Sequence, residues 1–203
     1  MNLALFDLDH TLIPFDSVMA WTQFLVARGV LPPQAEPAYL AYCHQYVAGS
    51  LNIHDMHRAS MAPLMPFTHQ QRRAWAAEFE VQMRPRISAA MLALVRRHQA
   101  AGELCAIVTA TSRLVAEPFA RLFGIDELMA TEAATVGGLA GAALTGEIDG
   151  VPCFREHKLT HVNRWLVQRQ TRLDAFERSW FYSDSASDLP LLAAVSHPVA
   201  VHP

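Results

Sequence analysis

The stretch from Asn2 to Thr11 reads NLALFDLDHT, an apolar run that ends abruptly in two carboxylates. A short, continuously apolar segment of this kind predicts a strand buried on both faces, as in a parallel sheet. Asp7 and Asp9 then follow the carboxyl end of that strand, where open parallel sheets place their ligand sites. The stretch therefore predicts a fold class and also the first residues of a site.

The second half of the chain alternates in the same way. Helical patterns are expected over 87–101, 112–123, 157–169 and 189–195, with strands over 102–109, 179–183 and 198–201. Residues 131–150 carry five glycines among small and β-branched residues, which favours a hairpin or two short strands. Strands that alternate with helices predict an α/β fold with a Rossmann-like, mostly parallel sheet flanked by helices.

Residues 15–85 have a different pattern. Helical periodicities run over 18–27, 34–47, 53–61 and 70–83, and glycine and proline residues separate them. None of these segments has the pattern of a convincing strand. We therefore expect residues 1–14 and 86–203 to form an α/β core domain, into which 15–85 is inserted as an all-helical cap domain.

Composition excludes several classes of protein. The net charge is −3, and the sixteen basic residues are scattered rather than gathered in a tract, so nucleic acid is not an expected partner. No apolar run approaches the roughly 20 residues that cross a bilayer, and no basic start precedes the first apolar stretch, so no membrane partner is expected and the location is expected to be cytoplasmic. The widely spaced Cys43, Cys105 and Cys153 suit reduced thiols.

Reactive residue types recur in a fixed order at the expected strand ends and helix starts. They are Asp7 and Asp9 in DLDHT, Thr109 in VTAT, Lys158 in EHKLT, and Asp184 and Asp188 in SDSASD. This set resembles the motifs of the haloacid dehalogenase superfamily of phosphohydrolases, and the helical insertion resembles the cap of its phosphoserine phosphatase branch. The resemblance implies a magnesium-dependent phosphatase that hydrolyses a small organic phosphate monoester through an aspartyl phosphate.

The residue types suit this chemistry independently. Enzymes accelerate the very slow hydrolysis of phosphate monoesters mainly by neutralising charge and by positioning the reactants. Magnesium takes oxygen ligands and usually keeps waters. The side chains of Asp7 and Asp184, with the backbone carbonyl of Asp9, make a plausible partial metal shell. Asp188 is expected to support the metal waters or to orient Lys158.

The resemblance also implies catalytic roles. Asp7 would attack phosphorus, and Asp9 would protonate the leaving alkoxide and later deprotonate the attacking water. The Thr109 hydroxyl and the Ala110 amide would bind a phosphate oxygen, and Lys158 would neutralise charge.

Each motif also has a structural explanation. Asp7 and Asp9 suit a solvated turn at a strand exit, and Thr109 suits the cap of the next helix. Lys158 suits a solvated basic face, and Asp184 and Asp188 suit a helix N-terminus, which favours negative charge.

Two residues of the insertion are candidates for substrate binding. Asp16 lies nine residues after Asp7, where members of the phosphoserine phosphatase branch carry an acidic residue that contacts the substrate amine. An amine-bearing substrate such as phosphoserine or histidinol phosphate is therefore expected, although Asp16 is one methylene shorter than the glutamate of phosphoserine phosphatases. Arg58 is a candidate partner for a substrate carboxylate, with an ordinary surface cation as the alternative. His10 stands where many members of the superfamily carry glycine.

Two other functions use a similar set of residues. A phosphotransferase or mutase would pass the aspartyl phosphate to a second substrate instead of water. A phospho-receiver module also combines an acidic pair with a hydroxyl and a lysine. Its acidic pair and its phosphorylated aspartate come from different strands, however, and a bulky helical insertion after the first strand has no evident use there.

Overall fold

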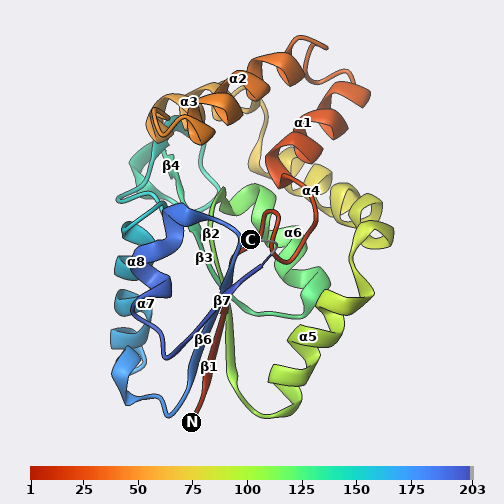
Figure 1. Ribbon diagram of the computed structural model, residues 1–203. Helices are drawn as coiled ribbons and strands as arrows, with labels where there is room; N and C mark the ends of the chain where they lie inside the picture. The colour runs from red at the N-terminus through yellow and green to blue at the C-terminus, as the bar shows by residue number, and fades with distance from the viewer. Residues whose placement is uncertain (202–203) are drawn as a thin grey trace.

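The computed structural model of the chain describes residues 1–201 and is built around a five-stranded sheet (Figure 1). Its strands are β1 (Leu3–Phe6), β2 (Leu104–Ser112), β3 (Glu127–Thr131), β6 (Ser179–Ser183) and β7 (His197–Ala200). The order across the sheet is β3-β2-β1-β6-β7, and every neighbouring pair is parallel. The expected Rossmann-like parallel sheet is confirmed, with the first strand of the chain at its centre.

Strand β1 is buried because both faces of the sheet are covered. Leu3 and Leu5 pack with Phe181 on one face, whereas Ala4 and Phe6 belong to the apolar cluster on the other. This division follows from the alternation of side chains along a strand. All four residues of β1 have 0% exposure, so the continuous apolar run has the location that its sequence predicts.

Four helices cover the faces of the sheet: α5 (Ala89–Ala100), α6 (Arg113–Phe123), α7 (His157–Gln168) and α8 (Leu189–Leu192). Helices α5 and α6 lie on one side and α7 and α8 on the other (Figure 1). Gly124 ends α6 in the left-handed conformation, with a φ of 65°, which favours glycine. The flanking layers expected from the alternating pattern are therefore present.

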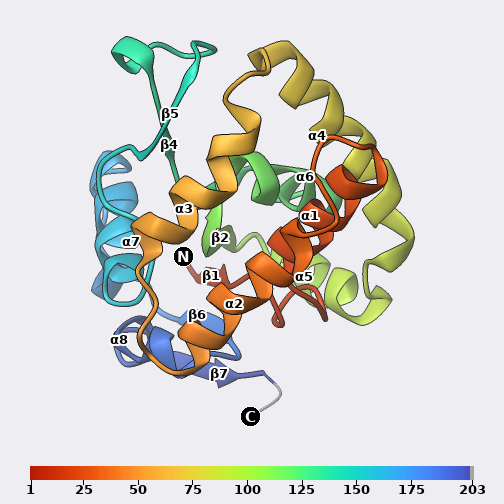
Figure 2. The same ribbon diagram turned by 90° about the horizontal axis from the view of Figure 1, so that it is seen from above.

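The insertion after β1 consists of α1 (Ser17–Ala27), α2 (Ala35–Val47), α3 (Ile53–Met61) and α4 (His69–Met83), with short 3₁₀ turns after α3 and α4. Helices α1, α2 and α3 lie toward the carboxyl ends of the strands, and α4 lies beside α6 (Figures 1 and 2). Trp21 and Phe24 pack on Phe79, and Phe79 meets Phe119 of α6 with ring centroids 5.6 Å apart. The apolar core of the insertion is thus continuous with that of the sheet, and its division into a separate domain over 15–85 stays a prediction.

The structure differs from the expectations in two places. Strand β3 was not expected, and β2 continues to Ser112, three residues past Thr109. The expected hairpin is present as β4 (Ala133–Thr135) and β5 (Leu144–Ile148), which pair antiparallel. This hairpin stands beside α3 in the view from above (Figure 2).

Two further observations concern the described residues. None of the helices over residues 1–201 has the length and apolar character that crossing a bilayer requires. Cys43, Cys105 and Cys153 are all free thiols, as expected.

Candidate active site

A buried lysine joins two carboxylates at the carboxyl edge of the sheet. Lys158, in the first turn of α7, donates from Nζ to Asp7 Oδ1 at 2.8 Å and to Asp188 Oδ2 at 2.7 Å. Asp188 Oδ2 also accepts from the Ser183 hydroxyl at 2.7 Å. The exposed fractions of Lys158, Asp7 and Asp188 are 4%, 7% and 0%. Three residues far apart in sequence therefore form one enclosed ionic group.

Burial controls the charges of this group. It raises the pKa of Asp7 to about 6, an effect that Lys158 opposes and that Asp188 reinforces. Burial alone would lower the pKa of Lys158, but the two carboxylates outweigh it and raise that pKa above its ordinary value. Lys158 therefore carries its charge at every physiological pH. A solvated basic face does not account for this residue.

The Asp9 carboxylate accepts hydrogen bonds from two residues that are not among the predicted site residues. Its Oδ1 accepts from the backbone N–H of Ser17 at 2.7 Å, and its Oδ2 accepts from the Thr111 hydroxyl at 2.8 Å. The hydroxyls of Ser17 and Thr111 are themselves 3.2 Å apart. Burial and the nearby Asp16 carboxylate raise the pKa of Asp9 to about 7. A group with such a pKa can give and take a proton near neutrality.

Thr109 and Ala110 also lie at this edge of the sheet and line the same cavity as Asp7. Thr109 is 1% exposed, and its hydroxyl oxygen accepts from the backbone N–H of Thr111 at 3.2 Å. The carbonyl of Ala110 accepts from the Thr131 hydroxyl at 2.8 Å, which ties β2 to the end of β3. Thr109 is a strand residue rather than a helix cap.

The side chains of the predicted metal residues do not form one cluster. Thr11 holds Asp184 near the loop after β1, because its hydroxyl donates to Asp184 Oδ1 and accepts from the Asp184 N–H, both at 3.1 Å. Asp188 instead binds Lys158, as the alternative role predicted. Within residues 1–201, no group of three His, Cys, Asp or Glu side chains is arranged to hold a metal. The Asp9 carboxylate is bound by Ser17 and Thr111, which leaves its backbone carbonyl as the expected metal ligand, and the magnesium site stays a prediction.

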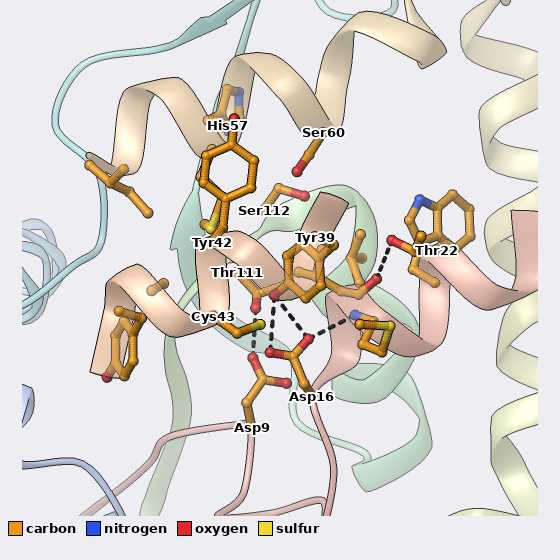
Figure 3. Close-up of a pocket in the computed structure, with 18 of the residues that line it drawn as sticks. Asp9, Asp16, Thr22, Tyr39, Tyr42, Cys43, His57, Ser60, Thr111 and Ser112 are labelled. Atoms are coloured by element: carbon orange, nitrogen blue, oxygen red, sulfur yellow. Dashed lines mark hydrogen bonds between the residues drawn. The ribbon is translucent and has the colours of Figure 1, made fainter. Parts of the chain in front are cut away.

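Asp16 lines the cavity and also stabilises α1. It is the N-cap residue of that helix, and its Oδ1 accepts from the Met19 N–H at 2.7 Å. The Tyr39 hydroxyl lies 3.0 Å from both carboxylate oxygens (Figure 3). Asp16 is therefore anchored from two sides in a fixed position beside Asp9.

Arg58 does not reach this site. It forms ion pairs on the protein surface with Asp55 and with Glu147 of β5, the latter at 3.1 Å, and its side chain is 46% exposed. Its position corrects the prediction that it contacts a substrate carboxylate. Its partner Glu147 lies 89 residues further along the chain, so no local pattern indicates this contact.

The cavity between the sheet edge and the inserted helices has a volume of about 730 Å³. Asp7, Asp9 and Lys158 line this cavity together with residues of α1, α2 and α3. Figure 3 shows Asp9 and Asp16 on one side of it and His57 and Ser60 of α3 on the other. Its size is in the range of sites that enclose small molecules.

Residues 4–193 match the family model described as haloacid dehalogenase-like hydrolase. This chain belongs to the haloacid dehalogenase-like hydrolases. The matched range covers almost the whole chain. The resemblance that the ordered motifs indicated is therefore confirmed.

Individual members of the family are similar over most of their length. A histidinol-phosphatase from Neisseria meningitidis serogroup C is 37% identical over 100% of this chain and 90% of its own. A structure of a protein with unknown function from Bordetella pertussis Tohama I is 40% identical, with a TM-score of 0.88 over 98% of this chain and 89% of that one. The family match and the similar histidinol-phosphatase support the expected enzyme class, a phosphatase of this hydrolase family.

A more distant structure, a phospho-aspartyl intermediate analogue of phosphoserine phosphatase, shares the fold. Its identity is 17% and its TM-score 0.65, over 98% of this chain and 85% of that one. At this identity the likeness concerns the fold alone. It confirms the expected Rossmann-like class for this member of the family.

Proposed function

We propose that this hydrolase is a magnesium-dependent phosphatase that cleaves a small, amine-bearing phosphate monoester through an aspartyl phosphate on Asp7. The observation that carries the proposal is the buried Lys158, which donates to Asp7 at 2.8 Å and to Asp188 at 2.7 Å. A fixed cation beside a buried carboxylate at the floor of a cavity suits the transfer of an anionic phosphoryl group, because transition-state charge is neutralised without reorganisation.

The reaction has two balanced steps. An oxygen of the Asp7 carboxylate bonds to phosphorus while the ester P–O bond breaks, and the protonated Asp9 gives its proton to the leaving alkoxide. Water then attacks phosphorus as the Asp9 carboxylate takes its proton, and the acyl phosphate bond breaks to regenerate Asp7 and release inorganic phosphate. A pKa of about 7 for Asp9 suits both directions of proton transfer.

Several oxygen atoms at the site suit magnesium as ligands. The Asp7 and Asp184 carboxylates and the Asp9 backbone carbonyl would supply oxygen ligands, and a magnesium site with one or two carboxylates usually keeps several waters. The buried Asp188 Oδ1 has no hydrogen-bond partner within residues 1–201, so an acceptor remains for a further donor beside this site. When bound, the ion neutralises charge on the phosphoryl oxygens.

The substrate amine is expected to bind near Asp16. Asp16 and Asp9 place two carboxylates on one side of the cavity, and Asp16 is held there by Tyr39 and by α1. Histidinol phosphate is the first substrate to test, because the similar protein from Neisseria meningitidis is a histidinol-phosphatase. Phosphoserine, the other amine-bearing candidate, is the natural comparison.

Phosphate release from a panel of monophosphates tests the proposal. The purified protein with magnesium is expected to release phosphate from at least one amine-bearing member, and a chelator is expected to stop the reaction until magnesium is restored. Asp7→Asn is the matched inactive control. Failure to hydrolyse any member of a broad panel would refute the proposed activity, and full activity after metal removal would refute the role of magnesium.

A further inference from the structure

The charges on the cavity wall are strongly asymmetric. Asp7, Asp9, Asp16 and Asp184 all line it. In the part of the chain that the structure describes, Lys158 is the only lysine or arginine among the lining residues, and both of its hydrogen bonds go to carboxylates. A cation that is already bound on two sides and lies at the phosphoryl end of the cavity is not free to pair with a second anion on the substrate.

The other basic residues near the cavity do not change this balance. Arg58 is on the surface, paired with Asp55 and Glu147. His57 lines the wall, but burial lowers its pKa, which favours the neutral ring. His10, the other lining histidine, is exposed to solvent in the loop after β1. The leaving-group end of the cavity therefore offers carboxylates and uncharged groups.

The helices around the cavity contribute many apolar side chains to its wall. Among them are Met56 and Met61 of α3, Trp21 and Leu25 of α1, and Val115 of α6. Uncharged polar groups are interspersed, and Figure 3 shows the Ser60 hydroxyl on the same wall. Trp21 Nε1 and His57 Nε2 are buried without a hydrogen-bond partner among residues 1–201. A wall of this kind suits a heteroaromatic ring, which has an apolar face and also atoms that can form hydrogen bonds.

We infer that this cavity selects monophosphates of amino alcohols that carry an apolar or heteroaromatic group and lack a carboxylate, and that it rejects phosphoserine. The inference rests on the proposed phosphatase activity and narrows its substrate class. A substrate carboxylate would enter a confined site beside Asp9 and Asp16, where the described lining residues include no unpaired lysine or arginine, and an unpaired charge in such a place is strongly unfavourable. A ring, in contrast, would leave water for the apolar wall.

Three congeners isolate the two effects. Phosphoethanolamine is the parent, O-phosphoserine adds a carboxylate to its amine-bearing carbon, and histidinol phosphate adds an imidazolylmethyl group at the same atom. Relative to phosphoethanolamine, we expect kcat/KM to be about tenfold or more higher for histidinol phosphate and about tenfold or more lower for phosphoserine. Phosphoserine turnover equal to or above that of histidinol phosphate would overturn the inference.

A charge introduced on the wall provides the matched test. Ser60→Arg places a cation among the lining residues and is expected to raise the ratio of phosphoserine to phosphoethanolamine turnover by about tenfold, whereas Ser60→Met, of similar bulk without the charge, is not. Circular dichroism checks that both variants are folded. An equal ratio in the two folded variants would contradict the electrostatic explanation.

Two further measurements separate this inference from the proposed function. Hydrolysis of p-nitrophenyl phosphate reports phosphatase activity without using the amine or the ring. Calorimetric titration of the three congeners into Asp7→Asn, which lacks the nucleophile, ranks their binding without turnover. If the protein hydrolyses p-nitrophenyl phosphate but binds phosphoserine more tightly than histidinol phosphate, the substrate class alone is refuted. If the three congeners bind in the expected order but no phosphate ester is hydrolysed, the proposed activity alone is refuted.

Discussion

The Thr111 hydroxyl donates a hydrogen bond to Asp9 Oδ2 at 2.8 Å, and so links strand β2 to the loop that follows β1. The other oxygen of Asp9 accepts from the Ser17 N–H at 2.7 Å. Both carboxylate oxygens of Asp9 are therefore fixed in direction, as Figure 3 shows for the contact with Thr111. A group that transfers protons depends on such placement, because the proton must be within hydrogen-bond reach of the oxygen it leaves or joins.

Replacing Thr111 with valine is expected to impair proton transfer to the leaving group. The loss in kcat should be about tenfold or more with an alkyl phosphate, whose alkoxide needs a proton, and much smaller with p-nitrophenyl phosphate, whose leaving group does not. The ratio of the two kcat values is the measurement. Equal losses on both substrates would show that Thr111 does not act through Asp9.

Thr111→Ser is the control for this prediction. It keeps the hydroxyl and is expected to restore most of the alkyl phosphate activity. If serine were as poor as valine, the methyl packing of Thr111, and not its hydrogen bond, would be the important feature.

Asp9→Asn removes the proton donor but keeps the backbone carbonyl that would bind magnesium. We expect turnover of alkyl phosphates to fall by roughly 10²- to 10⁴-fold, the usual contribution of a general acid and base. Magnesium binding measured by calorimetry should persist. A variant that keeps its turnover, or that no longer binds the metal, would show that the division of roles between Asp7 and Asp9 is wrong.

Lys158→Met is expected to abolish activity and to destabilise the fold. It leaves Asp7 and Asp188 buried close together without their cation, and loss of one partner of a buried ionic group lowers the free energy of unfolding by about 3–5 kcal/mol. Urea unfolding measures this change. An exposed control, Arg172→Met, removes a cation whose side chain is 79% exposed and should change stability little. Similar midpoints for the two variants would argue against the buried ionic group.

Asp16 has a structural and a proposed recognition role, and two variants separate them. Asp16→Ala removes the N-cap of α1 and should lower the free energy of unfolding by about 1 kcal/mol. Asp16→Asn keeps a capping oxygen and should leave stability nearly unchanged. If Asp16 binds the substrate amine, Asp16→Asn will nevertheless raise KM for histidinol phosphate by about tenfold, with little effect on p-nitrophenyl phosphate. An unchanged KM would limit Asp16 to its structural role.

Much of the fold could be predicted because its signals are local. The run Leu3–Phe6 is buried on both faces, and its continuous apolar character shows this directly. Strand β3 was missed because Glu127 starts it and Asp126 precedes it, and acidic residues are uncommon in strands. Its place at the edge of the sheet makes these residues acceptable, and that place depends on pairing with β2.

The candidate site was partly predictable for a related reason. Asp7 was found because it follows a strand with a clear pattern, and Lys158 because it belongs to an ordered set of motifs that resembles the superfamily. Thr111 was not found, because its importance comes from its contact with Asp9, 102 residues earlier in the chain. For Arg58 a substrate contact and a surface cation both stayed open, because helical periodicity does not show that Glu147 holds it on the surface. Long-range pairing of side chains is the information that the local pattern lacks.

Transfer of the phosphoryl group to Asp7 is the central claim, and direct detection of the phosphoenzyme tests it. The protein is mixed with magnesium and histidinol phosphate, quenched in acid and digested, and the peptides are analysed by mass spectrometry. We predict one added phosphoryl group on Asp7, lost on treatment with hydroxylamine and absent from Asp7→Asn. Substrate turnover without a modified Asp7 in rapidly quenched samples, or continued turnover by Asp7→Asn, would contradict the account.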